Sequence, residues 1–253
     1  MRSLFTLIRI LLKRLGVDVF PRQKGYHYVP DYYGTAAPKL IDIRSLPWFD
    51  MLARQVISQK RTLLYYDRLY TIYQALFRIK VAIGDSPANM AEVGVYKGGG
   101  SYFIAATLQM LKWESATLHC LDTFEGHASQ DVRAEDPHQR ASSFSDTSFE
   151  SVKGYLSQFP NIQVYKGRIQ ETSPQIEEKT FCFVHLDMDL YEPTVFSLKF
   201  FDRRLLSGGV IIVDDYGFLT CPGVKQAVDE FMEGNTHYFG LHLLTGQYIL
   251  AKR

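Results

Sequence analysis

From residue 88 onward, short apolar segments alternate with longer segments of helical character, and this alternation restricts the possible folds most strongly. The apolar segments read MAEVGVY, TLHCLD, IQVYKG, FCFVHLD and GVIIVDD. Such alternation is typical of parallel strands joined by helical crossovers, since helices then cover both faces of the sheet. The chain ends with HYFGLHLL, TGQ and YILAKR, which predicts an antiparallel hairpin. We therefore expect an α/β fold with five parallel strands and a terminal hairpin.

Helical segments are also visible. In YYDRLYTIYQALFRIKVAIG, apolar residues recur on one helical face at positions 69, 72, 73, 76 and 79. The sequence TSFE, which begins at Thr147, predicts a helix that starts with a capping box. The pair Glu192 and Pro193 suits the first turn of another helix.

Composition excludes some classes of protein. The net charge of +1 gives no reason to expect nucleic acid as a partner. The three cysteines show no C-x-x-C spacing, and Cys120 and Cys182 lie in strand-like runs, so we interpret them as buried core residues. A reducing, cytoplasmic setting fits this use of cysteine.

The first 62 residues differ from the rest, and we expect two parts: an N-terminal arm over residues 1–62 and an α/β domain over residues 63–253. The start, MRSLFTLIRILLKRLG, predicts an amphipathic helix that is too short to span a bilayer. It would lie at a membrane surface as a peripheral contact, or dock on its own domain or on a second subunit of a homo-oligomer. The irregular stretch that follows carries aromatic residues suited to stack on sugars or to pack in an interface: Tyr26, Tyr28, Tyr32 and Tyr33.

In an open parallel sheet, ligands bind at the carboxyl ends of the strands. The first strand leads into EVGVYKGGGS, where Gly94 and the run from Gly98 allow close approach of backbone to a ligand. The spacing is not G-x-G-x-x-G, because Tyr96 occupies the second glycine position, and this disfavours a dinucleotide. Glu92 instead suits a ligand that carries an ammonium group.

The second and third strands end in further candidate ligand contacts. Asp122 follows the glycine run at the distance expected of an acid that binds ribose hydroxyls, although a strand-end aspartate can also cap a turn. The segment Gly167–Ile169 follows the third strand, and its position suggests a border for an adenine ring.

Four carboxylates follow the fourth and fifth strands. Asp187 and Asp189 end one strand, and Asp214 and Asp215 end the next. If the two strands are neighbours, these groups converge, and their repulsion requires a compensating cation or proton. A hard divalent ion such as Mg²⁺ would suit an all-oxygen site. His185 lies within the fourth strand, where a buried, hydrogen-bonded histidine is favoured over a catalytic one.

Together these motifs resemble the macrocin O-methyltransferase family. The resemblance rests on EVGVYKGGGS, LDTFEG, FSDTSFESV, HLDMDLYEPT, LSGGVIIVDDYG and GVKQAVDEF, and it covers residues 63–253. It implies a Rossmann-like class I methyltransferase fold with an N-terminal helical extension. The implied activity is S-adenosylmethionine- and Mg²⁺-dependent methylation of a sugar hydroxyl. We expect residues 1–62 and the loop over residues 126–145 to shape the substrate pocket.

The resemblance also implies roles for matching residues. The expected cofactor-binding residues are Glu92, Gly94, Tyr96, Lys97, Gly98, Ser101, Asp122, Thr123, Phe124, Gly167, Arg168, Ile169 and Asp187. The expected metal ligands are Asp189, Asp214 and Asp215, with Asp187 as a fourth ligand or as support for the others. A substrate hydroxyl would attack the sulfonium methyl group in line, and Asp189 would take its proton, a task that Asp187 or His185 could share.

Two other classes stay open at this point. Asp187-Met188-Asp189 is a D-x-D pattern, which metal-dependent glycosyltransferases use, but it leaves the second acid pair and Glu92 unexplained. A non-catalytic binding module with a cofactor fold is the other alternative, and the full set of acids argues against it. The acceptor is also open between a macrolide sugar, a nucleotide-linked sugar and a surface glycan.

Overall fold

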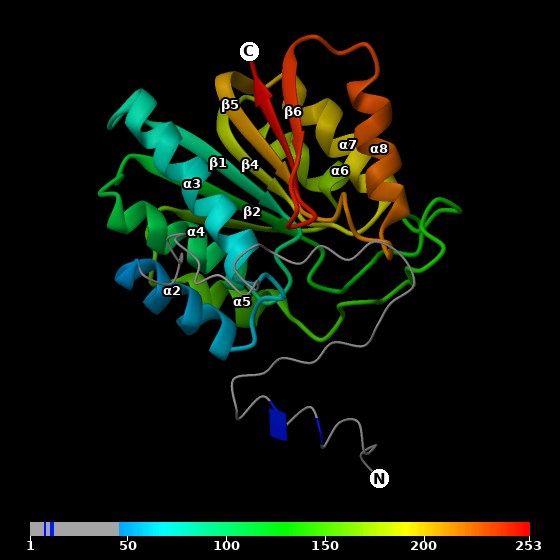
Figure 1. Ribbon diagram of the computed structural model, residues 1–253, viewed down its shortest axis with the longest axis horizontal. Helices are drawn as coiled ribbons and strands as arrows, with labels where there is room; N and C mark the ends of the chain where they lie inside the picture. Colours follow the sequence, from blue (N-terminus) through cyan, green and yellow to red (C-terminus); the bar gives the residue numbers. More distant parts are fainter. Residues whose placement is uncertain (1–7, 9–10, 13–45) are drawn as a thin grey trace. The chain divides into compact units, whose positions relative to one another are not determined.

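A computed structural model describes residues 46–253, together with residues 8, 11 and 12 (Figure 1). The residues from 46 onward belong to one compact unit, Ile43–Arg253. Apart from Ile8, Leu11 and Leu12, the predicted helix over residues 1–16 lies outside the described residues, as does the arm with its four tyrosines. Of the helices in the described part of the chain, none has the length and apolar character needed to cross a membrane.

Seven strands form one sheet in the order β3-β2-β1-β4-β5-β7-β6. The first five strands pair in parallel, and β7 pairs antiparallel with both β5 and β6, which confirms the predicted terminal hairpin. The strands are β1 Ala88–Val93, β2 Ala116–Asp122, β3 Ile162–Lys166, β4 Phe181–Leu186, β5 Leu205–Val213, β6 Tyr238–His242 and β7 Tyr248–Lys252.

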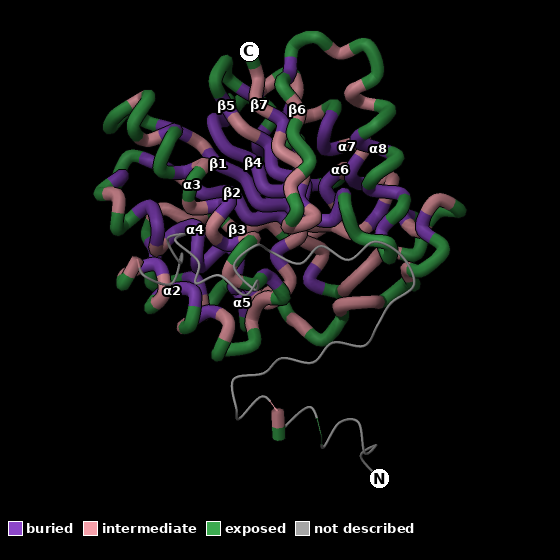
Figure 2. Tube along the Cα trace, in the orientation of Figure 1, coloured by how far each residue is buried: buried purple, intermediate pink, exposed green. Residues whose placement is uncertain are grey.

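Helices cover both faces of this sheet. On each face, buried residues of the helices and of the strands pack together in one hydrophobic cluster (Figure 2). In one cluster, residues of helices α2, α3, α4 and α5 pack on Met90 and Phe183 of the sheet. In the other, residues of α6, α7 and α8 pack on Ala91 and Val184. Neighbouring strand residues thus point to opposite faces, and both faces are buried, as the continuous apolar runs predict. The helical segments are α2 Pro47–Ser58, α3 Tyr66–Ile83, α4 Gly99–Met110, α5 Phe149–Leu156, α6 Ile169–Thr172, η3 Ser173–Ile176, α7 Tyr191–Asp202 and α8 Pro222–Met232.

Helix α2 lies in the segment that the sequence assigned to the N-terminal arm, yet it contributes to the core of the sheet. It packs on α4, and its residues Phe49, Ala53 and Val56 are fully buried in the same cluster as strand residues. The division of the chain at residue 62 stays a prediction, but the packing places the first core residue before residue 50.

The strand order reverses between β1 and β4. Such a switch point leaves a crevice outside the carboxyl ends of the two strands, because their crossover helices lie on opposite faces. Backbone hydrogen bonds keep the ends of neighbouring strands aligned there. Asp187 N donates to Val93 O at 2.9 Å, and Asp214 N donates to Leu186 O at 2.8 Å. The glycine turn and both acid pairs therefore meet at one edge of the sheet.

Candidate functional site

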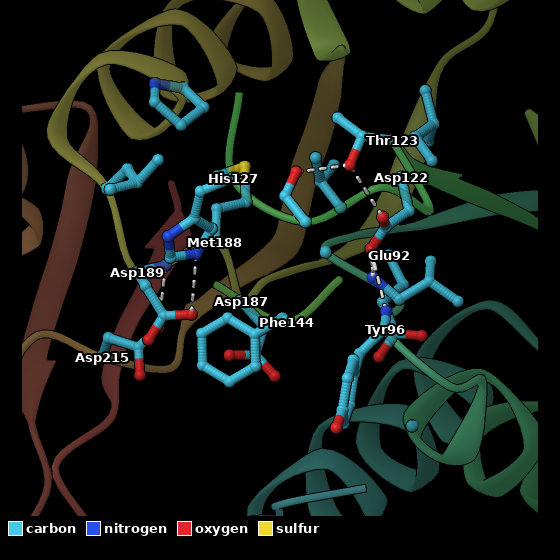
Figure 3. Close-up of a pocket in the computed structure, with 18 of the residues that line it drawn as sticks. Glu92, Tyr96, Asp122, Thr123, His127, Phe144, Asp187, Met188, Asp189 and Asp215 are labelled. Atoms are coloured by element: carbon cyan, nitrogen blue, oxygen red, sulfur yellow. Dashed lines mark hydrogen bonds and ion pairs between the residues drawn. The ribbon is translucent and has the colours of Figure 1, made fainter. Parts of the chain in front are cut away.

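A pocket of about 270 Å³ lies at this edge, close to the size of small-molecule sites in proteins. It extends from the end of β3, past β2 and β1, to the ends of β4 and β5. Figure 3 shows Asp122 and Tyr96 on one side of it and Asp189 and Asp215 on the other. The predicted site residues that line it are Glu92, Gly94, Tyr96, Asp122, Thr123, Gly167, Arg168, Ile169, Asp187, Asp189 and Asp215.

The turn after β1 requires its glycines. Gly94 has φ +88°, and a Cβ atom there would overlap the carbonyl oxygen of Asp187, so β1 and β4 approach closely only with glycine at this position. Gly98, with φ +87°, is the N-cap of α4. Gly100 faces the carboxylate of Glu92, which a Cβ atom would also overlap.

Asp122 holds this turn in place. Its Oδ2 accepts hydrogen bonds from Val95 N at 2.6 Å and Tyr96 N at 2.8 Å, and its Oδ1 accepts one from Phe124 N at 2.6 Å. Burial raises the pKa of Asp122, while these backbone donors act in the opposite direction. Thr123 Oγ1 also donates to Oδ1, at 3.5 Å, so the roughly four acceptor positions of the carboxylate are all engaged, and a ligand in the pocket that Asp122 lines would replace this longest bond.

Behind the turn lies a buried chain of charged groups. Ser101 Oγ donates to Glu92 Oε2, and Glu92 Oε1 is 3.0 Å from His185 Nδ1. His185 Nε2 in turn is 3.6 Å from Asp214 Oδ1. Burial alone lowers the pKa of His185, but the adjacent carboxylates of Asp214 and Glu92 outweigh it and raise that pKa to about 10.

His185 is therefore buried between two carboxylates, which favour its protonated form. Its side chain has no exposed surface and does not line the pocket. The arrangement agrees with the favoured expectation of a buried, hydrogen-bonded histidine.

The acids after β4 and β5 converge. Asp187, Asp214 and Asp215 each offer a carboxylate oxygen within 4.8 Å of the others, and Asp189 forms a similar group with Asp215 and Cys221. The compact all-carboxylate group thus contains Asp187, whereas the sequence named Asp189, Asp214 and Asp215 as the ligand set.

Only part of this negative charge is balanced. Asp214 is fully buried; it accepts hydrogen bonds from Arg68 and from Gln247 Nε2, and burial is outweighed by His185 and Arg68, which lower its pKa. The pKa values of Asp187 and Asp215 are raised well above the usual value by burial and by neighbouring acids. A divalent cation would relieve this repulsion, and oxygen donors at this spacing fit a hard ion.

Asp189 differs from the other three acids. Its φ of +60° is unusual for a residue other than glycine, and its backbone N donates to Asp215 Oδ2 at 3.3 Å. Its side-chain oxygens face His127 Nε2 at 3.6 Å and Cys221 Sγ at 3.4 Å. Figure 3 shows His127 beside the Asp189 carboxylate.

At the opposite end of the pocket, Arg168 anchors the loop that follows β2. Its Nε donates to Asp131 Oδ2 at 2.8 Å and its second nitrogen donates to Oδ1, which makes a two-point pair with a carboxylate that is nearly buried. Arg168 thus fixes the loop and lines the pocket through the same side chain.

The remaining predicted residues lie outside the lining of the pocket. The predicted residues that do not line it are Lys97, Gly98, Ser101, Phe124, His185 and Asp214. Among the lining residues that sequence reasoning did not name individually are Arg68, His127, Asp131 and Cys221, although His127 and Asp131 belong to the loop over residues 126–145 that was expected to shape the pocket. His127 lies directly after LDTFEG and was within reach of motif analysis, whereas Arg68 and Cys221 meet the acids only through tertiary packing.

Comparison with known proteins identifies the family. A sequence model described as Macrocin-O-methyltransferase (TylF) matches residues 54–238, which is most of the chain. The chain belongs to the macrocin O-methyltransferase family. The resemblance inferred from the motifs is thus confirmed, and the match begins within α2, before the expected boundary at residue 63.

Relatives of this macrocin O-methyltransferase family member act on natural products. Over 184 residues the chain is 28% identical to demethyldecarbamoylnovobiocin O-methyltransferase of Streptomyces niveus, which covers 69% of this chain and 68% of the relative. Over 191 residues it is 26% identical to 8-demethyl-8-(2,3-dimethoxy-alpha-L-rhamnosyl)-tetracenomycin-C 4'-O-methyltransferase of Streptomyces olivaceus, with 72% and 71% covered.

Solved structures show the same fold. The O-methyltransferase NovP superposes with a TM-score of 0.71 at 21% identity, covering 81% of this chain and 98% of its own. The calicheamicin methyltransferase CalS11 gives a TM-score of 0.60 at 18% identity, with 86% and 99% covered. This macrocin O-methyltransferase family member is thus an enzyme with the S-adenosylmethionine-dependent methyltransferase fold, and the glycosyltransferase and non-catalytic alternatives are set aside.

Proposed function

We propose that the enzyme methylates a sugar hydroxyl of a glycosylated small molecule, with S-adenosylmethionine as methyl donor and a divalent metal as cofactor. The observation that carries the proposal is the convergence of Asp187, Asp214 and Asp215 beside the glycine turn, in one pocket of a family of O-methyltransferases. The acceptor class follows the relatives, which are named for novobiocin, tetracenomycin and mycinamicin precursors. We therefore favour a sugar of a natural product over a surface saccharide as the acceptor.

The end of the pocket near β1 to β3 is where we place the cofactor. There Glu92 and Gly94 would face its methionine part, Asp122 its ribose, and Gly167–Ile169 its adenine. Bound S-adenosylmethionine supplies a sulfonium-activated methyl group. Tyr96, with φ +52°, bends the turn so that its backbone N meets Asp122, which fixes this end of the pocket before a ligand arrives.

Asp187, Asp214 and Asp215 are the metal ligands that we propose. Mg²⁺ held there would supply Lewis-acid activation of an acceptor hydroxyl. Two of the three carboxylates have no cation in direct contact among the described residues, and burial together with the neighbouring acids raises their pKa values, an effect that a bound ion would counter. Asp214 differs because Arg68 and His185 already compensate it, so we expect it to contribute the most fixed of the ligand oxygens.

Asp189 is the general base that we propose, rather than a ligand. The acceptor oxygen attacks the methyl carbon, the carbon–sulfur bond breaks, and the hydroxyl proton passes to an Asp189 carboxylate oxygen, which leaves a methyl ether and S-adenosylhomocysteine. Assigning the base to Asp189 and the ligand role to Asp187 avoids asking one carboxylate to do both. Holding the acceptor in line between the two ends of the pocket can lower the barrier by up to ~7–11 kcal/mol.

The proposal is tested by calorimetry and by product analysis. Full-length enzyme should bind S-adenosylhomocysteine both with Mg²⁺ and with a chelator, because Asp122, which we assign to the ribose, lies on the opposite side of the pocket from Asp215. With S-adenosylmethionine and Mg²⁺, it should methylate demethyldecarbamoylnovobiocin or mycinamicin III, and the chelator should stop this reaction. Cofactor binding without dependence of turnover on metal would reject the metal proposal, and absence of cofactor binding would reject the whole.

A cytoplasmic location, a homo-oligomer and contact of residues 1–16 with a membrane surface stay predictions from the sequence. Sedimentation of the full chain, alone and with anionic lipid vesicles, would distinguish the last two.

A further inference from the structure

Asp189 is held by an unusual set of contacts. Its backbone has a left-handed conformation, which is strained for a residue other than glycine. Its carboxylate then lies between two side chains from distant parts of the chain, His127 on Oδ2 and Cys221 on Oδ1. Strain of this kind persists only where surrounding contacts fix it, so the partners of Asp189 are informative.

Among the residues that the structure describes, His127 has no other polar side-chain partner that would explain its burial. Its side chain is 9% exposed, and its Nδ1 is buried without a hydrogen-bond partner. The ring packs on Phe144 at 5.2 Å between centroids, and Nε2 faces Asp189. The backbone of His127 pairs with Ser142 and Ser143 at 2.9 Å each, so the ring position is set where the two ends of the loop meet.

Cys221 approaches Asp189 from the other side. It is the N-cap residue of α8, and its thiol is buried, donates to Asp189 Oδ1 and accepts from Gln139 Nε2 at 3.4 Å. Gln139 belongs to the same loop as His127, so both partners of Asp189 are connected to this loop. A contact on each oxygen, a hydrogen bond from Cys221 on Oδ1 and the longer approach of His127 to Oδ2, restricts rotation of the carboxylate.

We propose that His127 and Cys221 are positioning residues that orient the Asp189 carboxylate towards the acceptor hydroxyl. The inference rests on the proposed function, in which Asp189 is the base. The 3.6 Å between His127 Nε2 and Asp189 Oδ2 is longer than a hydrogen bond, as is common for catalytic contacts before substrate binds. Through this contact the loop over residues 126–145, which also lines the pocket, aligns the Asp189 carboxylate with the acceptor hydroxyl.

The first test is kinetic, with demethyldecarbamoylnovobiocin or mycinamicin III as acceptor. H127A should lower kcat by about 10–100-fold, the range typical of groups that orient a functional residue, while the acceptor KM and the affinity for S-adenosylhomocysteine change little. H127Q, which can place an amide nitrogen near the position of Nε2, should restore much of kcat. C221S should be milder than C221A for the same reason. H138A, at an exposed histidine of the same loop, is the matched control and should match the wild type.

A rise in acceptor KM without loss of kcat would overturn the proposal, since His127 would then be an acceptor-binding residue. H127Q as impaired as H127A would also overturn it. If D189N is inactive while H127A is normal, the positioning role fails and the proposed function survives. If D189N is fully active, the base assignment itself fails.

A crystal structure of H127A tests the same point without an acceptor. The Asp189 carboxylate should turn away from its wild-type orientation while Asp187 and Asp215 keep theirs. An Asp189 carboxylate that is unmoved in H127A and in C221A would refute the proposal whatever the acceptor proves to be.

Discussion

At the scale of single residues, the four acids at the strand ends are chemically unequal although they look alike in the sequence. Asp214 lies against the half-buried Arg68 and the buried His185, while Asp187 and Asp215 repel one another. An alanine or asparagine at position 214 therefore tests more than metal binding. The neighbouring residue offers a cleaner experiment.

We predict opposite effects of D214N and D215N on the stability of the metal-free protein. D214N leaves Arg68 and His185 without their carboxylate and should cost on the order of 3–5 kcal/mol. D215N removes a repelling charge and should leave stability unchanged or raise it, while it abolishes Mg²⁺ binding. Urea unfolding in chelator and Mg²⁺ calorimetry measure the two effects. Equal destabilisation by both variants would contradict the unequal roles.

The raised pKa of His185 predicts a dependence of stability on pH. A histidine whose pKa rises from 6.5 unfolded to about 10 folded stabilises the protein fully below pH 6.5, and this contribution is lost as pH rises to about 10. The melting temperature of the metal-free enzyme should therefore fall across this window. H185Q should have a lower melting temperature at neutral pH and a flatter profile. A wild-type profile as flat as that of H185Q would show that His185 is neutral in the fold.

Gly94 gives a prediction about backbone. G94A would force a Cβ atom into the Asp187 carbonyl and an alanine into φ +88°, so the free energy of unfolding should fall by more than about 1 kcal/mol and Asp187 should shift. Gly154, inside α5 with open space around it, is the matched control. G154A should stabilise by about 0.5–1 kcal/mol, because alanine favours a helix. Thermal unfolding of both variants, with a structure of G94A, checks this.

At the scale of elements, the strands were predictable from the sequence and the helix caps were less so. Each apolar run after residue 88 became a strand in a buried sheet, because the signal is local. The capping box expected at Thr147 was wrong by one residue: Ser148 is the N-cap of α5 and accepts from Ser151 N. Thr147 Oγ1 instead donates to Tyr96 O at 2.6 Å, a partner 51 residues away that no local pattern reveals.

The shifted cap predicts a separation of function between two adjacent residues. S148A removes the cap of α5 and should lower stability by about 0.5–2 kcal/mol without affecting affinity for S-adenosylhomocysteine. T147A releases the loop from the glycine turn at Tyr96 and should weaken that affinity with a smaller loss of stability. Denaturant unfolding and calorimetry on both variants decide; the reverse pattern would mean that Thr147 is the effective cap.

At the scale of the whole molecule, the sequence predicted which strand ends form the site but not which helices complete it. The order of strands follows from rules about crossovers and switch points, so the convergence of Gly94, Asp122 and the acid pairs was predictable. The contribution of Arg68 on α3 to the pocket was not, nor was that of α2 to the core, since an amphipathic helix shows that it is buried but not against which surface. The same difficulty concealed Cys221 beside Asp189.

The packing of α2 in the core predicts where the chain can be shortened. A chain that begins at residue 43 keeps every residue of the compact unit and should fold and bind S-adenosylhomocysteine as the full chain does. A chain that begins at residue 63 loses α2, whose buried residues include Phe49, Ala53 and Val56. Burial of one large apolar side chain contributes roughly 1.5–3 kcal/mol, and a whole domain is stable by only about 5–15 kcal/mol.

The shorter chain should therefore be unfolded or aggregated, as circular dichroism and gel filtration would show. A folded chain from residue 63 would restore the boundary inferred from the sequence. If the chain from residue 43 binds the cofactor but loses methylation of demethyldecarbamoylnovobiocin or mycinamicin III that the full chain performs, the missing segment is required for the acceptor, as the sequence predicts. Unchanged methylation would limit residues 1–42 to a role outside catalysis.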